Sequence, residues 1–466
     1  MQLRLQLKRM ILFDRGRDVD WLHAVSHFWA APWLRSDGSA RFEGSHTALG
    51  KKMNYDESNI QASYPEKFVC PDCFDDEHLK AFIDDTARSR CCSYCGKRTQ
   101  SKKIAAPVDG VIERIFKGIS SRYGEAWASG CSWDNEDDRY INETHDTGDL
   151  LQEYVELSND NSGELYQNIL DALPSWQWSS NKPWSATDAQ VLQWGWDRFV
   201  ASVKYKRRFF FTHLAEAERD REDLDPSSML VEFGQRCSNN GLIVKIPKDT
   251  EILRCRPRAA KAERFTKARE LGPPPNRLAK QNRMSPAGIP MFYGSDDKKT
   301  TLAEMPDLPK LYAIGSFTTL RSLNVLDFTN VRAPSIFDMT DGYDYDWALF
   351  MSQFLKDFSS PIKRDDCIHI DYVPTQVITE YLRDAKLGGG RVDGIKYRSA
   401  RNKSGICYVL FIDEHGVDPN AGDLSAEQVE NEQWQKPKIG YTLKLTGVTH
   451  HPRGPKRKIQ KNSTSD

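Results

Sequence analysis

Four cysteines near the start of the chain have the spacing that a metal site requires. Cys70 and Cys73 form one Cys-x2-Cys pair, and Cys92 and Cys95 form a second pair after eighteen intervening residues. Each pair places two thiolates on one side of a tight turn, and two such turns complete a tetrahedral set of ligands for zinc. Four thiolates leave no position for a reacting water, so the spacing predicts a structural zinc site. Cys91 is an alternative ligand to Cys92, but only Cys92 gives the Cys-x2-Cys spacing.

A second group of side chains lies in MFYGSDDKKTTLAE, residues 291–304. The apolar run predicts a strand that ends at Tyr293, and TTLAE predicts a capped helix that starts near Thr300 and carries Glu304. From these residues alone, a purely structural role stays open for each side chain. A carboxylate near a helix start favours the helix dipole, and a tyrosine at a strand end is commonly a packing residue.

The elements that must position these residues divide the chain into five segments. We predict an N-terminal extension of little pattern, a cysteine knuckle, a helical domain, a domain of strands and helices, and a polar, basic tail. Their bounds are 1–60, 61–105, 106–235, 236–420 and 421–466. The helical prediction rests on stretches such as VDGVIERIFKGI, in which apolar residues recur at intervals of three and four. Translation starting at Met53 is an alternative for the first segment, so whether residues 1–52 belong to the folded protein stays open.

The segment 236–420 combines short strands with separate helices. The strands are predicted at 242–246, 252–256, 291–293, 323–329, 393–399 and 406–411, the last two as a pair. Helices are predicted at 345–358 and 375–386. This mixture is typical of the α+β class. The chain has no GxGxxG and no GxxxxGK[ST], so neither a dinucleotide-binding Rossmann turn nor a P-loop is predicted.

Composition limits the cellular setting and the partners. The 466 residues carry a net charge of −1, which gives no reason to expect a nucleic-acid partner. No apolar run is long enough to span a membrane, and no secretory signal opens the chain. Five of the ten cysteines lie near the paired motifs and the others are scattered, which favours a reduced, cytoplasmic protein.

Several stretches of the segment 236–420 resemble the RES domain family, and they occur in family order. They are ILRCRP, NRMSPAGIPMFYGS, TTLAEM, LNVLDFT, YVPTQVITEYL and DGIKYRSARNKSGICYVLF. Residues 64–235 are similar to the helical HEPN-type domain that is often joined to RES domains, with Lys204, Tyr205 and Arg208 at its characteristic positions.

The resemblance implies a fold related to the ADP-ribosyltransferases. RES proteins are mostly bacterial toxins of toxin–antitoxin pairs, and they degrade NAD+ at the nicotinamide–ribose bond with water or phosphate as acceptor. It also implies neutralisation by an antitoxin or by the N-terminal domain of the chain itself. The oligomeric state stays open.

The resemblance assigns the catalytic roles to Arg254, Tyr293, Glu304 and Ser399. A carboxylate at Glu304 would stabilise the positive charge that develops on the ribose, and Tyr293 would hold the flat nicotinamide ring. Arg254 would grip the pyrophosphate with two parallel hydrogen bonds. Ser399 would bond a ribose hydroxyl or Glu304. Arg283 is a further candidate for fixing a loop or contacting a phosphate.

Some features depart from the family pattern or leave alternatives. Arg256 competes with Arg254, because both lie on the same face of one predicted strand. Cys255 stands where many members have an aromatic residue, and 257–275 is a long basic insertion. One alternative activity is transfer of ADP-ribose to a macromolecule. Another is RNA cleavage at Arg208-x4-His213, a spacing seen in HEPN ribonucleases, with an inert RES domain.

Overall fold

The structure is a computed structural model that describes residues 57–160, 162–209, 224–305, 310–359, 368–419 and 440–451. Most of the predicted N-terminal extension and His213 lie outside the described residues. No helix among the described residues is long and apolar enough to cross a membrane. The described residues all belong to one contact unit, which runs from Asn54 to Asp466.

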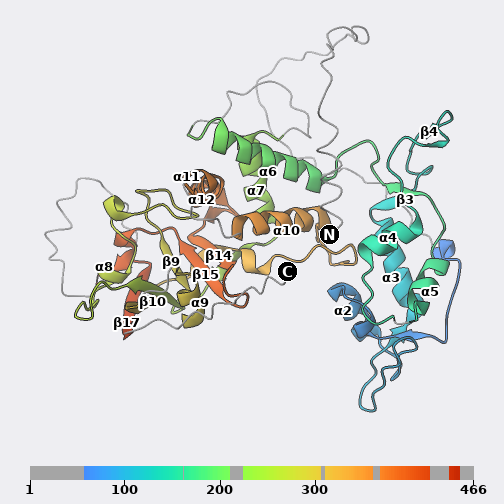
Figure 1. Cartoon of the computed structure of the whole chain (residues 1–466), viewed down its shortest axis with the longest axis horizontal. Helices are drawn as coiled ribbons and strands as arrows, with labels where there is room; N and C mark the ends of the chain where they lie inside the picture. Colours follow the sequence, from blue (N-terminus) through green and yellow to red (C-terminus); the bar gives the residue numbers. More distant parts are fainter. Residues whose placement is uncertain are drawn as a thin grey trace, which may run out of the picture. The chain divides into compact units, whose positions relative to one another are not determined.

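The N-terminal half combines helices with short two-stranded ladders (Figure 1). Its helices are α2 Glu77–Thr86, α3 Val108–Ser120, α4 Thr147–Tyr154 and α5 Glu164–Ala172. Its ladders pair β1 Phe68–Val69 with β2 Ala106–Pro107, β3 Tyr123–Glu125 with β6 Trp178–Ser180, and β4 Trp133–Asp134 with β5 Arg139–Tyr140. The central helix is α3, whose residues Val111, Ile115 and Ile119 are fully buried on one face, as the apolar period predicts.

The next two helices pack with the C-terminal half. They are α6 Asp188–Tyr205 and α7 Pro226–Asn239. Thr187 begins α6 with a capping box, in which the Thr187 and Gln190 side chains each accept from the other residue's backbone N–H. Trp196 and Phe199 of α6 share a core cluster with α10 Tyr345–Ser359 and α12 Val373–Asp384.

A nine-stranded mixed sheet forms the C-terminal half, in the order β16-β17-β10-β8-β9-β15-β14-β11-β7. The bounds are β7 Ile243–Ile246, β8 Glu251–Pro257, β9 Phe292–Ser295, β10 Tyr312–Thr319, β11 Leu323–Asp327, β14 Gly394–Arg398, β15 Ile406–Leu410, β16 Val417–Asp418 and β17 Leu443–His451. Short elements outside this sheet are α8 Ala268–Leu271, α9 Lys298–Ala303, α11 Ile368–Asp371, β12 Lys386–Leu387 and β13 Gly390–Arg391. The antiparallel pair β14–β15 confirms the predicted pairing.

The two faces of the sheet belong to different core clusters. Val409 packs with α6, α10 and α12, whereas its neighbour Leu410 packs with Phe292 and Phe317 on the other face. Adjacent strand residues point to opposite faces, so both faces of this central strand are covered and its sequence is almost continuously apolar.

Strands β10 and β17 were not predicted from the sequence. In β17, buried Leu443 and Leu445 flank exposed Lys444, and the strand pairs with β10 along its length. The alternation of a half-buried strand is therefore present between residues 443 and 446. The prediction of a polar tail over 421–466 was therefore wrong for β17. The alternation covers only four residues, and the surrounding sequence is rich in charged residues.

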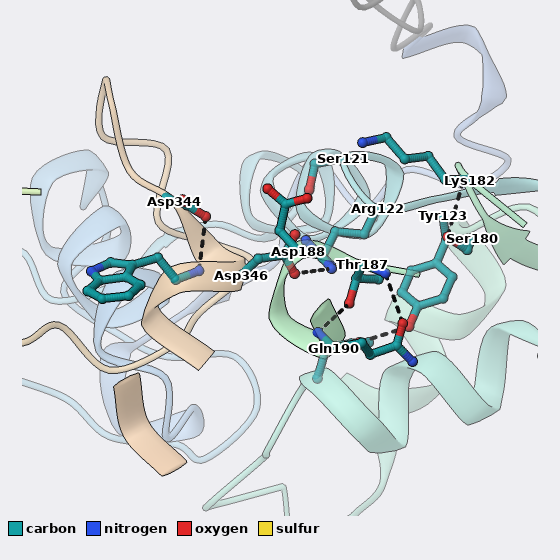
Figure 2. A network of polar contacts seen from close by, with 12 residues as sticks. Ser121, Arg122, Tyr123, Ser180, Lys182, Thr187, Asp188, Gln190, Asp344 and Asp346 are labelled. Atoms are coloured by element: carbon teal, nitrogen blue, oxygen red, sulfur yellow. Dashed lines mark hydrogen bonds and ion pairs between the residues drawn. The ribbon is translucent and has the colours of Figure 1, made fainter. Parts of the chain in front are cut away.

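A segment of the C-terminal half belongs to the N-terminal core. Phe337 is 1% exposed and packs in the same cluster as α3, and Arg114 Nη2 donates to its carbonyl at 2.9 Å. A Cβ on Gly118 would lie 2.6 Å from the Phe337 ring, so the glycine permits this approach. Arg122 pairs with Asp346 in the first turn of α10 at 2.8 Å (Figure 2).

Candidate functional site

The four paired cysteines converge on one point, as predicted. The sulfur of Cys70 lies 3.8 Å from that of Cys73 and 3.5 Å from that of Cys95, and the sulfurs of Cys73 and Cys92 are 3.7 Å apart. A tetrahedral zinc with bonds of about 2.3 Å requires sulfur–sulfur distances of about 3.8 Å. The donor set therefore fits a metal that is fully ligated by protein.

The structure also distinguishes between the adjacent cysteines. Cys92 belongs to the group of sulfurs that lie within 4.8 Å of one another, whereas the Cys91 thiol donates to the Cys92 carbonyl. Three of the four cluster cysteines are buried and Cys95 is half-buried. Such a closed site is suited to holding the two turns together.

Two of the predicted catalytic residues, Glu304 and Ser399, are in direct contact. The Ser399 hydroxyl donates to Glu304 Oε1 at 2.5 Å, and its oxygen accepts from the backbone N–H groups of Arg401 and Asn402. Ser399 is 5% exposed. These three bonds fix the hydroxyl, which in turn fixes the carboxylate of Glu304.

The loop that carries Ser399 is tied to helix α9. Asn402 donates to the Thr300 hydroxyl at 2.7 Å, and Arg401 donates to the carbonyl of Met305 at 3.0 Å. Gly405 lies so close to α9 that an added Cβ would be 2.6 Å from Thr300 Cγ2. The contact between Ser399 and Glu304 therefore depends on close packing of a loop against a helix.

The predicted position of Glu304 within its helix was wrong. Helix α9 begins after Asp297, whose side chain accepts from the Thr300 N–H, and it ends at Ala303 with Glu304 as its C-cap. The negative end of a helix dipole disfavours a carboxylate, so the dipole does not explain this residue. The N-cap lies earlier than expected because Asp297, and not Thr300, supplies the capping oxygen.

Tyr293 lies on β9 and is held at its hydroxyl. Its side chain packs against the core cluster that includes α10 and α12, and its hydroxyl lies 2.9 Å from the Ser285 hydroxyl. Burial raises the pKa of Tyr293 to about 12, so the phenol stays neutral near pH 7. The ring therefore has both the core contact expected of a packing residue and a polar partner.

Arg254 lies where strands β8 and β9 meet. The strands pair at Leu253 and Ser295, and beyond this pair Arg254 Nη1 donates to the Tyr293 carbonyl at 3.3 Å. The guanidinium also lies 5.4 Å from the centre of the Phe292 ring. Burial lowers the pKa of Arg254 to about 10, which still leaves the group charged near neutral pH.

The two other candidate arginines are bonded to backbone carbonyls. Arg283 Nη1 donates to the carbonyl of Phe358 in the last turn of α10 at 2.5 Å. Arg256 donates to the Glu270 carbonyl and its guanidinium lies 5.4 Å from the Phe265 ring. Cys255 packs on Leu302 and Tyr312.

Tyr397 and Cys407 were not identified from the sequence. They form a cross-strand pair between β14 and β15. Burial raises the pKa of Tyr397 well above its usual value, and the negative charge of Glu304 adds to this shift. In the sheet, β15 lies between β14, which carries Tyr397, and β9, which carries Tyr293. In the sequence, Tyr397 shows only the alternation that is ordinary for a strand, so nothing marked it as a site residue.

The HEPN-type residues have structural contacts at the end of α6. Lys204 pairs with Asp371 at 2.9 Å, and Arg208 turns back to the carbonyls of Val203 and Lys204. Tyr205 is 73% exposed. The histidine of the proposed ribonuclease pair lies outside the described residues.

Comparisons with known families agree with both halves of the chain. A family model described as HEPN/RES N-terminal domain 1 matches residues 85–217, and one described as RES domain matches residues 253–428. No curated protein and no solved structure matched the chain. The resemblance recognised in the sequence is therefore confirmed for both domains and for their order.

Proposed function

Because the chain carries a RES domain behind a HEPN/RES N-terminal domain, we propose that it degrades NAD+ by cleaving the nicotinamide–ribose bond. The observation that carries the proposal is the carboxylate of Glu304, held by the Ser399 hydroxyl at 2.5 Å. Cleavage develops positive charge on the ribose, and a fixed carboxylate beside that sugar stabilises it without having to reorganise.

The other residues would bind and orient the dinucleotide. Tyr293 offers an aromatic surface for nicotinamide, and the charged Arg254 beside it suits the pyrophosphate. Arg283 would act through its loop, because its guanidinium is bonded to the end of α10. Water or phosphate would accept the ADP-ribosyl group, in a domain of ADP-ribosyltransferase-like fold.

We also propose that the protein is toxin-like and cytoplasmic, and that its N-terminal half restrains the RES domain. A separate antitoxin would be a second source of restraint. Helix α10 supports this proposal. Its first turn pairs with Arg122 of the N-terminal half, and its last turn bonds Arg283. A zinc ion on the four cysteines would fix the knuckle of this half as a structural element.

The test is NAD+ consumption by the purified full-length chain, followed by chromatography with and without phosphate. We expect nicotinamide release, and a loss of about 100-fold or more in Glu304→Gln, which keeps the shape but removes the charge. Glu251→Gln, at an exposed position on β8, is the control. Unchanged activity in Glu304→Gln would refute the role of this carboxylate. Incorporation of labelled ADP-ribose into macromolecules would show transfer in place of release.

A further inference from the structure

The N-terminal half exposes large apolar side chains in one surface region. Trp127 is 72% exposed, Trp184 63%, Ile141 59% and Trp133 42%. We call these four residues the tryptophan surface. Three tryptophans exposed to this degree in one region are unusual for a surface that faces only water, and tryptophan is enriched at the centres of protein interfaces.

Hydrogen bonds bring the members of the tryptophan surface together. Trp184 Nε1 donates to the Gly130 carbonyl at 3.1 Å, and Gly130 N–H donates to the Trp127 carbonyl at 3.1 Å. Ile141 N–H donates to the carbonyl of Ser132, which precedes Trp133. The region therefore comprises residues 127–141, which include the β4–β5 hairpin (Figure 1), and the turn at Trp184.

Two of the exposed indoles are held in place by their own contacts. The hydrogen bond to Gly130 fixes the ring of Trp184, and the Trp133 ring packs edge-on against Tyr140 with 4.9 Å between centroids. Rings that are already fixed lose little conformational entropy when a partner covers them. This favours a docking role over chance exposure.

The charge around these rings selects the partner. Residues 125–146 contain seven acidic residues and one basic residue, Arg139, which pairs with Asp137. Lys182 is an exposed cation in the adjoining turn. Among the described residues, the exposed side chains of Glu125, Glu136 and Glu143 have no basic side chain within ion-pair distance. Indole faces attract ammonium and guanidinium groups, and unpaired carboxylates at the rim complement the same charges.

We propose that the tryptophan surface docks a peptide segment of a partner protein that is rich in lysine and arginine. The apolar rings would cover the stems of the basic side chains, while the carboxylates would pair with their charged ends. The acidic residues within 125–146 would repel nucleic-acid phosphates and anionic lipid headgroups.

The test uses the full-length chain and a fluorescein-labelled peptide of alternating lysine and leucine, with a glutamate–leucine peptide for comparison. Fluorescence anisotropy should show binding of the lysine peptide only, weakening as salt is raised. Trp127→Ala and Trp184→Ala should each weaken binding by about 10-fold or more. Trp194→Ala is the matched control, because Trp194 is 44% exposed on α6, outside the surface.

Several results would overturn the proposal. They are equal binding of the glutamate peptide, no binding of either peptide, and an equal loss in Trp194→Ala and Trp127→Ala. Binding of an RNA oligonucleotide or of anionic vesicles in place of the lysine peptide would also overturn it. So would self-association that Trp127→Ala abolishes while the lysine peptide fails to bind. Circular dichroism of each variant separates loss of binding from loss of folding, and none of these measurements depends on NAD+ cleavage.

Discussion

The Ser399 hydroxyl donates to Glu304 Oε1 at 2.5 Å, although the two residues are 95 positions apart in the chain. Ser399 follows β14, and Glu304 ends the short helix α9. The carboxylate thus lies at the negative end of a helix, where only specific partners stabilise it.

Replacing Ser399 by alanine should reduce NAD+ cleavage while leaving the fold intact. The change removes a hydrogen bond to a charged group, which contributes about 1.5–3 kcal/mol, so we expect a loss of about 10- to 100-fold in kcat/KM. Ser399→Thr keeps the hydroxyl and should recover part of the activity. Steady-state kinetics of both variants check this, and wild-type rates in Ser399→Ala would contradict it.

Replacing Gly405 by alanine should also reduce NAD+ cleavage, although Gly405 is not one of the proposed catalytic residues. The added methyl group would lie 2.6 Å from Thr300 Cγ2, so the loop must move away from α9 and carry Ser399 with it. Overpacking of this kind costs about 1–3 kcal/mol, and we expect a fall in both melting temperature and NAD+ cleavage. Gly390→Ala is the control, because its Cβ would meet nothing within 4 Å. Equal behaviour of the two variants would contradict the packing argument.

Replacing either of two glycines of helix α3 by alanine should change the stability of the chain, but in opposite directions. Gly118→Ala places a Cβ 2.6 Å from the Phe337 ring and should destabilise the chain by about 1–3 kcal/mol. Gly110→Ala has its nearest neighbour at 4.0 Å and should stabilise the helix by up to about 1 kcal/mol. Urea unfolding measures both changes. If Gly118→Ala is as stable as Gly110→Ala, Phe337 does not pack tightly against α3.

Metal content should distinguish Cys92 from Cys91. Cys92→Ser removes one of four converging sulfurs and should abolish stoichiometric zinc binding, whereas Cys91→Ser should retain one zinc per chain. Elemental analysis of the purified proteins gives the ratio, and a melting curve with a chelator shows whether the metal stabilises the fold. Loss of zinc in Cys91→Ser alone would reverse the ligand assignment.

From the sequence by itself, the convergence of the four cysteines, several of the helices and strands, and the resemblance to the two matched domains could be predicted. Two Cys-x2-Cys pairs define their own local geometry, because the four residues of each pair form a tight turn that places both sulfurs on one side. The apolar period of α3 and the pairing of β14 with β15 could be predicted because they depend on neighbouring residues. Strand β17 was missed because its alternation is short and lies in a charged stretch, and β10 was missed although it pairs along its length with β8 and β17.

Tertiary structure decided which residues meet. Asp297 and not Thr300 caps α9, which moves Glu304 from the start of that helix to its end and towards Ser399. The order of strands in the sheet places Tyr397 of β14 opposite Cys407 of β15, and the burial of Phe337 in the N-terminal core follows from long-range packing. These contacts join residues far apart in the sequence, so no local pattern of residue types encodes them.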